Sequence, residues 1–227
     1  MPNVRHRLTA NRSLGIIVAV AAATAAACSA TGATAIPTQP AIATSAPSGA
    51  GAASGPTTYA TTSFGAPFSL TLPAGWKVVD DSPDMFTAYI APDPTSMDAA
   101  IDIQLVPVVH KDLCNKDAGD VTGGTTAADL AAWMLALAPL AATAGTATTI
   151  DGAPALVVDE SFTGTPCVNG ELWPTAGGWL DASEQKRYFV FEVGGKRLVA
   201  TIASSDAKFA AQSSGALAVL ESVNFTP

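Results

Sequence analysis

The residues best suited to covalent chemistry in this chain of 227 residues are its three cysteines, Cys28, Cys114 and Cys167. Cys114 and Cys167 each stand in a segment rich in turn-forming residues. If Cys28 is used elsewhere, these two form an even pair, and in an oxidising compartment we expect them to form a disulfide. Such a bond would close a loop of about 53 residues and contribute roughly 4 kcal/mol. Two free thiols or a metal pair are the alternatives.

Cys28 stands at the end of an apparent export signal. Residues 1–12 are basic and residues 13–27 form an uncharged apolar run, shorter than the ~20 residues of a membrane-spanning helix. Small residues (Ala25, Ala26 and Ala27) precede the cysteine, as in a bacterial lipobox. We therefore expect cleavage before Cys28 and diacylation of its thiol, which would give stable membrane anchoring. The alternative is ordinary cleavage at an A-x-A site, which would release the protein.

His110 is the one histidine beyond the export signal, and its neighbours Lys111 and Asp112 raise the question of acid–base catalysis. A serine nucleophile needs a poised position, and no G-x-S-x-G motif occurs. We therefore predict that His110 is a surface residue and that the protein is not an enzyme. A Cys/His zinc site is also disfavoured, because it needs more than one histidine.

Two groups of acidic residues raise the question of calcium, one at Asn115, Asp117 and Asp120 and the other at Asp80, Asp81 and Asp84. Neither has the spacing or the distant glutamate of an EF-hand loop. The sequence therefore predicts a solvated acidic rim without a metal site. The Gly-Gly pairs at 123–124 and 177–178 lack the lysine of a phosphate-binding loop, so no cofactor is predicted.

Trp173 and Trp179 lie in or beside a Gly- and Pro-rich segment and are the candidate ligand-binding residues. Exposed tryptophans can form a platform for sugars or apolar groups. Trp173 could equally cover one end of the hydrophobic core. We expect Trp76 and Trp133 to be core residues, since both lie on periodic apolar faces.

Charge and composition divide the chain into three parts. The formal net charge is −8, and because the basic residues Arg5, Arg7 and Arg12 stand in the export signal, the rest of the chain is more acidic still. A body this acidic is expected to repel nucleic acid. Residues 1–27 are predicted to be a lipoprotein signal peptide, residues 28–63 a flexible tether of Ala, Ser, Thr, Pro and Gly, and residues 64–227 one α+β domain.

Hydrophobic periodicity predicts the elements of that domain. Residues 68–72 alternate as a half-buried strand, and further strands are expected at 76–79, 85–90 and 101–106. Asp151-Gly152 and Gly194-Gly195 predict two hairpin turns. Helices are expected from Thr126, where Asp129 has capping-box spacing, to Pro139, and over residues 206–220. Residues 223–225 would form a short edge strand.

The order of these motifs resembles that of LpqN-type lipoproteins of actinobacteria and, more distantly, the PsbP-like fold. The matching segments are FSLTLPAGW (68–76), TIDGAPA (149–155), RYFVFEVGGKRLVATIAS (187–204) and LESVNF (220–225). The resemblance implies an antiparallel β-sheet flanked by helices and a binding or assembly role without catalytic residues.

We therefore expect a lipid-anchored lipoprotein of the cell envelope that acts as a non-catalytic binding or scaffolding module. It would sit on the outer face of the cytoplasmic membrane, with partial shedding, and its partners would be that membrane, through Cys28, and an envelope protein, glycan or lipid. A carrier of an apolar ligand between sheet and helices is the first alternative, and an envelope hydrolase is the second.

Overall fold

The computed structural model describes residues 55–90, 99–137, 140–162, 170–175 and 184–226. Cys28, Cys167 and Trp179 lie outside these residues, as do the signal peptide and most of the predicted tether. Within the described residues, no helix combines the length and apolar character needed to cross a membrane. The expected α+β class is confirmed, since antiparallel strands and two α-helices make up the domain.

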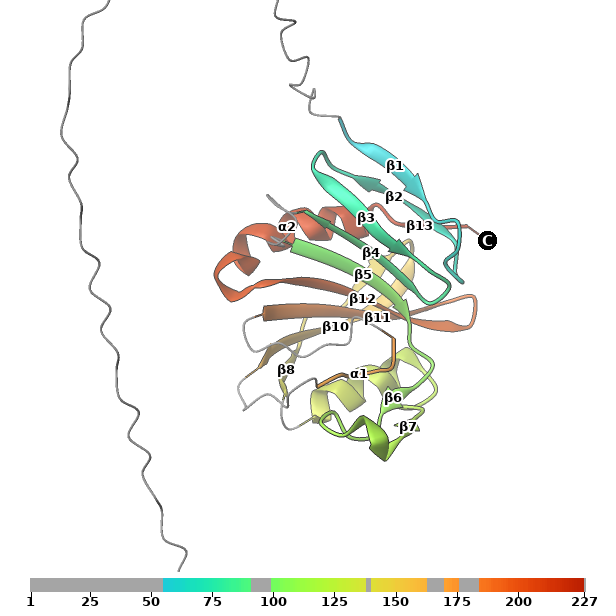
Figure 1. Cartoon of the computed structure of the whole chain (residues 1–227), viewed down its shortest axis with the longest axis vertical. Coiled ribbons are helices and arrows are strands. Elements are labelled where there is room, and N and C mark those ends of the chain that lie inside the picture. Colours follow the sequence, from blue (N-terminus) through green and yellow to red (C-terminus); the bar gives the residue numbers. More distant parts are fainter. Residues whose placement is uncertain (1–54, 91–98, 138–139, 163–169, 176–183, 227) are drawn as a thin grey trace, which may run out of the picture. The chain divides into compact units, whose positions relative to one another are not determined.

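The central layer is an eight-stranded antiparallel sheet in the order β3-β4-β5-β12-β11-β10-β8, with β9 also paired to β10 (Figure 1). A three-stranded sheet, β1-β2-β13, and a two-stranded one, β6-β7, accompany it. The strands are β1 (Thr57–Ala60), β2 (Phe68–Leu72), β3 (Trp76–Asp81), β4 (Met85–Ile90), β5 (Ala99–Leu105), β6 (Val109–His110), β7 (Asp120–Val121), β8 (Leu140–Ala144), β9 (Thr148–Ile150), β10 (Ala153–Phe162), β11 (Glu184–Val193), β12 (Lys196–Ser205) and β13 (Asn224–Phe225).

Both predicted hairpins are confirmed. Asp151 and Gly152 join β9 to β10 with φ values of 47° and 77°, which are the positive angles of a type I′ turn. Gly194 and Gly195, with φ values of 58° and 73°, join β11 to β12. β11 is an inner strand that is buried on both sides from Tyr188 to Phe191, as its continuous apolar run predicts.

The two helices begin and end close to the predicted positions. In α1 (Ala127–Ala136), the Thr126 hydroxyl accepts from the Asp129 backbone N–H, and the Asp129 carboxylate accepts from the Thr126 N–H. This is the predicted capping box, which typically contributes about 1 kcal/mol. The second helix, α2 (Asp206–Glu221), follows directly from β12, and a short 3-10 turn, η1 (Lys116–Ala118), precedes β7.

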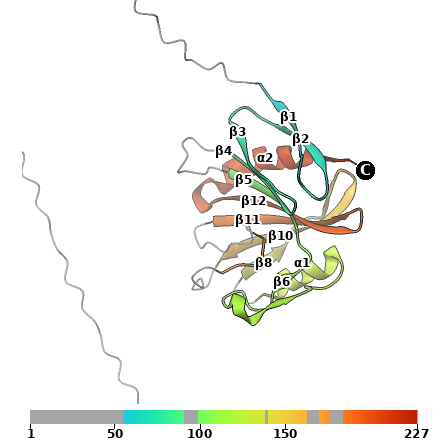
Figure 2. The same cartoon turned by 45° about the vertical axis from the view of Figure 1, so that its right-hand side comes forward.

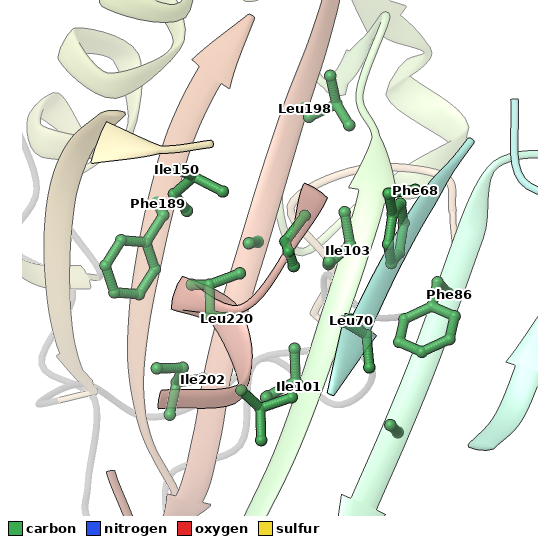
Figure 3. Close-up of a cluster of buried hydrophobic side chains, with 14 of the residues drawn as sticks. Phe68, Leu70, Phe86, Ile101, Ile103, Ile150, Phe189, Leu198, Ile202 and Leu220 are labelled. Carbon is green, nitrogen blue, oxygen red and sulfur yellow. The ribbon is translucent and has the colours of Figure 1, made fainter. Parts of the chain in front are cut away.

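The helices cover opposite faces of the sheet, and each face has its own core (Figure 2). Side chains of β5 and β12 alternate between the faces, so Ile101 and Ile202 point to α2 while Val199 points to the α1 side. Figure 3 shows the α2-side core, where Phe68 and Leu70 of β2 complete the packing of Phe86 and Leu220.

The domain begins earlier than predicted. β1 lies within the segment assigned to the tether, 28–63, yet it pairs antiparallel with β2 from Thr57↔Leu72 to Ala60↔Ser69. The Asp81 carboxylate fixes the turn that follows β1, because it accepts hydrogen bonds from the Tyr59 hydroxyl and from backbone or side-chain donors of Thr62, Ser63 and Phe64. The tether boundary at residue 63 is therefore wrong.

Arg197 of β12 holds the segment that connects β5 to α1. Its guanidinium donates to five backbone carbonyls, those of Val106, Pro107, Thr122, Gly123 and Gly124. Burial lowers the pKa of this arginine, although Asp129 and Glu192 oppose the effect. One charged side chain thus replaces the backbone partners that a regular strand would have supplied.

Candidate binding site

A pocket of about 530 Å³ lies on the α2 side of the sheet, next to that helix. We call it the α2 pocket. Val157 and Phe189, from β10 and β11, line it together with Leu217 and Glu221 of α2. The segment from Ala144 to Thr148 supplies further lining residues. The volume falls within the range of small-molecule pockets.

The wall opposite α2 arises from an irregularity in strand pairing. Ala144 pairs with Val158 and Thr148 pairs with Ala155, so residues 145–147 stand opposite only residues 156–157. An extra residue of this kind bends a strand as a β-bulge does. Gly145 makes the bend feasible, since a Cβ there would stand 2.5 Å from Cγ1 of Val157. The bend shapes one side of the pocket.

An ion pair lines the α2 pocket. Arg187 donates from Nε to Oδ1 of Asp159 at 2.6 Å and from Nη2 to Oδ2 at 3.2 Å. These residues are direct cross-strand partners on β10 and β11, and each side chain is 35% exposed. The same pair lines an adjoining hollow of about 220 Å³. A bidentate pair fixes the orientation of both groups, and both remain accessible to a ligand.

A second polar group lies on the other face of the sheet, across β4, β5, β12 and β11. Thr87, Asp102, Thr201 and Tyr188 form one cross-strand row, and Thr87 donates to Oδ1 of Asp102 at 2.7 Å. Burial raises the pKa of Asp102 to about 6, against the lowering effects of Thr87 and Lys186. Carboxyl groups with raised pKa values are common at functional sites, but here the row is flanked by fully buried side chains.

Glu160 of β10 interacts with the Tyr188 end of this row. Burial raises the pKa of the Glu160 carboxyl, although its interaction with the Tyr188 hydroxyl and the charge of Lys186 lower it. Burial likewise raises the pKa of Tyr188 well above its ordinary value, and Glu160 adds to the effect. The Tyr188 side chain has no exposed surface, which denies a substrate access to its hydroxyl.

His110 is buried, so its predicted surface position is wrong. Only 6% of it is exposed, its Nδ1 lies 2.7 Å from Oδ1 of Asp120 across the β6-β7 pair, and its Nε2 lies 3.5 Å from Glu171. Glu171 also pairs with Lys116 at 2.7 Å. Sequence reasoning missed the burial because Glu171 is distant in the chain. Through these contacts, His110 and Lys116 connect the β6-β7 region to the segment that contains Glu171.

Trp173 lies in the core and not on an open loop. It has no exposed surface, packs edge-on against Tyr188 at 5.9 Å between ring centroids, and donates from Nε1 to Gln104. Of the two roles left open for it, the structure favours covering the core over forming a ligand platform. Trp76 and Trp133 are partly buried against the two cores, in agreement with their predicted role.

Cys114 and Asp81, from other predicted features, do not line the α2 pocket. Cys114 is not a free thiol, and its predicted bond to Cys167 stays a prediction because Cys167 lies outside the described residues. In the described part of the chain no group of three or more His, Cys, Asp or Glu could hold a metal ion. Asp81, from the predicted acidic rim, serves as a hydrogen-bond acceptor for the turn after β1.

The pair that distinguishes the α2 pocket, Asp159 and Arg187, was not predicted from the sequence. Its partners stand on strands separated by a connection of more than 20 residues, so the register that joins them is not visible in the sequence. Both strands carry other charged residues, such as Glu160 on β10 and Lys186 on β11, so the sequence did not single out this pair.

No family model matches the chain, and no curated protein matches it. The chain is similar to the solved structure of cyanobacterial PsbP (CyanoP) from Synechocystis sp. PCC 6803, at 17% identity over 81% of this chain and 99% of that chain, with a TM-score of 0.42. It is also similar to LpqN of Mycobacterium tuberculosis, whose structure is described as that of a protein involved in cell envelope biogenesis. The identity is 15% over 76% of this chain and 92% of that chain, with a TM-score of 0.40.

A third similar structure is a protein of Bacteroides thetaiotaomicron VPI-5482, at 12% identity over 70% of this chain, with a TM-score of 0.38. This chain covers 45% of that protein, less than half of its length. Both names raised by the sequence resemblance, PsbP and LpqN, thus occur among the similar structures. Membership of an LpqN-type family stays a prediction.

Proposed function

We propose that the protein is a lipid-anchored, non-catalytic binding module of the cell envelope, and that it binds its ligand in the α2 pocket. The sequence supports the anchoring part through the basic and apolar segments before Cys28. A diacylated cysteine carries the two chains that stable anchoring needs. The region between Cys28 and β1 would let the domain reach away from the membrane surface.

The observation that carries the binding part is the α2 pocket with its oriented ion pair. The α2 pocket is an open space beside the helix, whereas the hydrophobic cores on the two faces of the sheet consist of buried side chains. Asp159 and Arg187 form an oriented charged pair where a bound molecule would meet it, and Glu221 of α2 adds a third charged side chain. A small number of fixed polar groups sets the orientation and specificity of a bound molecule in ligand sites.

The anchoring part is tested in the native host by mass spectrometry of the mature N-terminus. We expect a diacylated Cys28 in the membrane fraction, and no acylation in a Cys28→Ser variant. Unacylated wild-type protein recovered wholly in the culture fluid would contradict the proposal.

The binding part is tested with the mature protein in detergent and with separated lipid, polysaccharide and protein fractions of the envelope. We expect one fraction to raise the melting temperature of the wild type but not that of an Asp159→Asn, Arg187→Gln double variant. The bound material should be recovered chemically unchanged. Conversion of the bound material into a product would instead support the hydrolase alternative, and no shift from any fraction would contradict binding.

The alternative is a carrier of an apolar ligand, expected between sheet and helices, and one hollow away from both helices favours such a role. A hollow of about 520 Å³ lies between the β11-β12 turn and the chain around Gly65, and it is lined mainly by small and apolar residues such as Pro67, Val193 and Phe225. Organic extraction of the purified protein followed by mass spectrometry tests this function. A stoichiometric lipid in the extract would favour the carrier, and its absence would favour the α2 pocket.

A further inference from the structure

We infer that the ligand of the α2 pocket is an uncharged, polyhydroxylated molecule, namely a short neutral glycan. This inference rests on the proposed function, since it specifies the ligand class of the same pocket. It draws on three properties of the lining residues: their net charge, their mixture of hydrogen-bond donors and acceptors, and the apolar surface between them.

The charges that line the pocket disfavour an anionic ligand. Asp159 and Glu221 carry negative charge and Arg187 carries positive charge, so the lining has one excess negative charge. Arg187 is also neutralised by its bidentate contact with Asp159. A phosphate or carboxylate entering the pocket would therefore meet a compensated guanidinium and two carboxylates, and its desolvation would not be offset.

The hydrogen-bonding groups suit hydroxyls, which both donate and accept. The guanidinium fork of Arg187 has five N–H groups, and its contacts with Asp159 use one at Nε and one at Nη2. The carboxylates of Asp159 and Glu221 accept hydrogen bonds, while the Thr146 and Thr148 hydroxyls can do either. A ligand with many hydroxyls can satisfy both kinds of group, whereas a purely cationic ligand would leave the donors of Arg187 unused.

The apolar part of the lining suits the C–H face of a sugar ring. Val157 and Phe189 form the buried base of the pocket, only 7% and 2% exposed, so the accessible apolar surface comes mainly from Leu217 of α2, which is partly exposed beside them. An aliphatic chain would cover this surface as well, but it would also bury the Asp159–Arg187 pair without giving it hydrogen-bond partners. Removing water from the Arg187 N–H groups that Asp159 does not bind, with no hydrogen bond in return, is costly, so the pair selects against a lipid tail.

The test is titration of the isotopically labelled mature protein with maltotriose, cellotriose and galactotriose, followed by NMR. At least one of these neutral sugars is expected to shift the amide signals of residues 144–148, 157 and 217. Asp159→Asn is expected to weaken that binding by about tenfold, because a charged hydrogen-bond acceptor is lost. Thr148→Tyr should abolish it by filling the pocket.

The matched control is Thr149→Tyr, the next residue on β9, which is exposed but does not line the pocket. It should bind within about twofold of the wild type, since no contact with the ligand is changed. Equal loss in the Thr148 and Thr149 variants would overturn the inference, as would tighter binding of an oligogalacturonate than of galactotriose, or no response to any neutral sugar. If the lipid or protein fraction binds in the α2 pocket instead, the proposed function stands and the glycan inference fails.

Discussion

At the residue scale, the most informative carboxyl is Asp102, because its raised pKa makes stability depend on pH. Its pKa is about 6 in the folded protein, above the value of 3.8 for the unfolded chain. The Asp102 carboxyl therefore binds its proton more tightly in the folded than in the unfolded state. The resulting contribution to folding stability is fully present below about pH 4, where the carboxyl is protonated in both states. That contribution is lost as the pH rises through 6, by up to about 3 kcal/mol.

Urea denaturation at pH 5 and pH 7.5 measures this effect. The wild type is expected to lose stability between the two pH values, and Asp102→Asn should remove a large part of the difference, while Glu160, whose pKa burial also raises, accounts for part of the rest. Asp84→Asn is the control, since it deletes the same charge at an exposed position. An equal reduction of the pH dependence in both variants would show that overall charge, and not Asp102, causes it.

The pKa of Asp81 is shifted in the direction opposite to that of Asp102. Burial raises its pKa, but hydrogen bonds from Thr62, Tyr59 and Ser63 outweigh that effect and leave its pKa below the ordinary value. Asp81→Ala removes the acceptor that fixes the turn between β1 and β2, and we expect a loss of about 2 kcal/mol of unfolding free energy. Asp81→Asn, which retains one carbonyl oxygen, should lose less, as thermal or urea unfolding will show. Equal losses in the two variants would contradict the hydrogen-bonding role.

At the element scale, the sequence predicted those helix ends and turns that are stabilised by residues close together in the chain. The capping box at Thr126 and Asp129 and the turns at Asp151-Gly152 and Gly194-Gly195 all satisfy their requirements within a few residues. β1 and β8 were not predicted, because they are stabilised by pairing with other strands and carry no local strand signal of their own. Their Ala- and Thr-rich sequences resemble a tether, and they become strands only through pairing with β2 and β10.

Helix α2 contains a position where the sequence is not optimal for a helix. Gly215 lies in its interior, and a Cβ added there would have no heavy atom within 4 Å. Gly215→Ala should therefore raise the unfolding free energy by about 1 kcal/mol, because alanine has less conformational entropy to lose. Chemical denaturation measures the change.

Gly124→Ala provides the contrasting control for this prediction. Gly124 has a φ of 87°, and a Cβ there would stand 2.0 Å from Cβ of Asp129, so this substitution should destabilise the protein. A destabilised Gly215→Ala variant would contradict the open position assigned to that residue.

At the scale of the whole molecule, the sequence predicted the sheet-and-helix class but not how connecting segments meet. The turn around Cys114 and the segment before β11 are distant in the chain, yet Glu171 donates from its backbone N–H to the Leu113 carbonyl at 3.2 Å. His110 likewise donates to the carbonyl of Leu172 at 2.9 Å. Cys167 stands four residues before Glu171, a separation that an extended chain spans in roughly 14 Å.

These contacts favour the predicted disulfide between Cys114 and Cys167, since they hold the segment around Cys114 beside the segment that follows Cys167. The oxidised mature protein should be 2 Da lighter than its reduced form, and neither thiol should react with a maleimide in the unreduced state. Cys114→Ser is expected to lower the unfolding free energy by about 2–5 kcal/mol. Because one bond has two ends, Cys167→Ser and the double variant should lose about as much as Cys114→Ser alone. Additive losses, or two thiols reacting in the unreduced native protein, would contradict the bond.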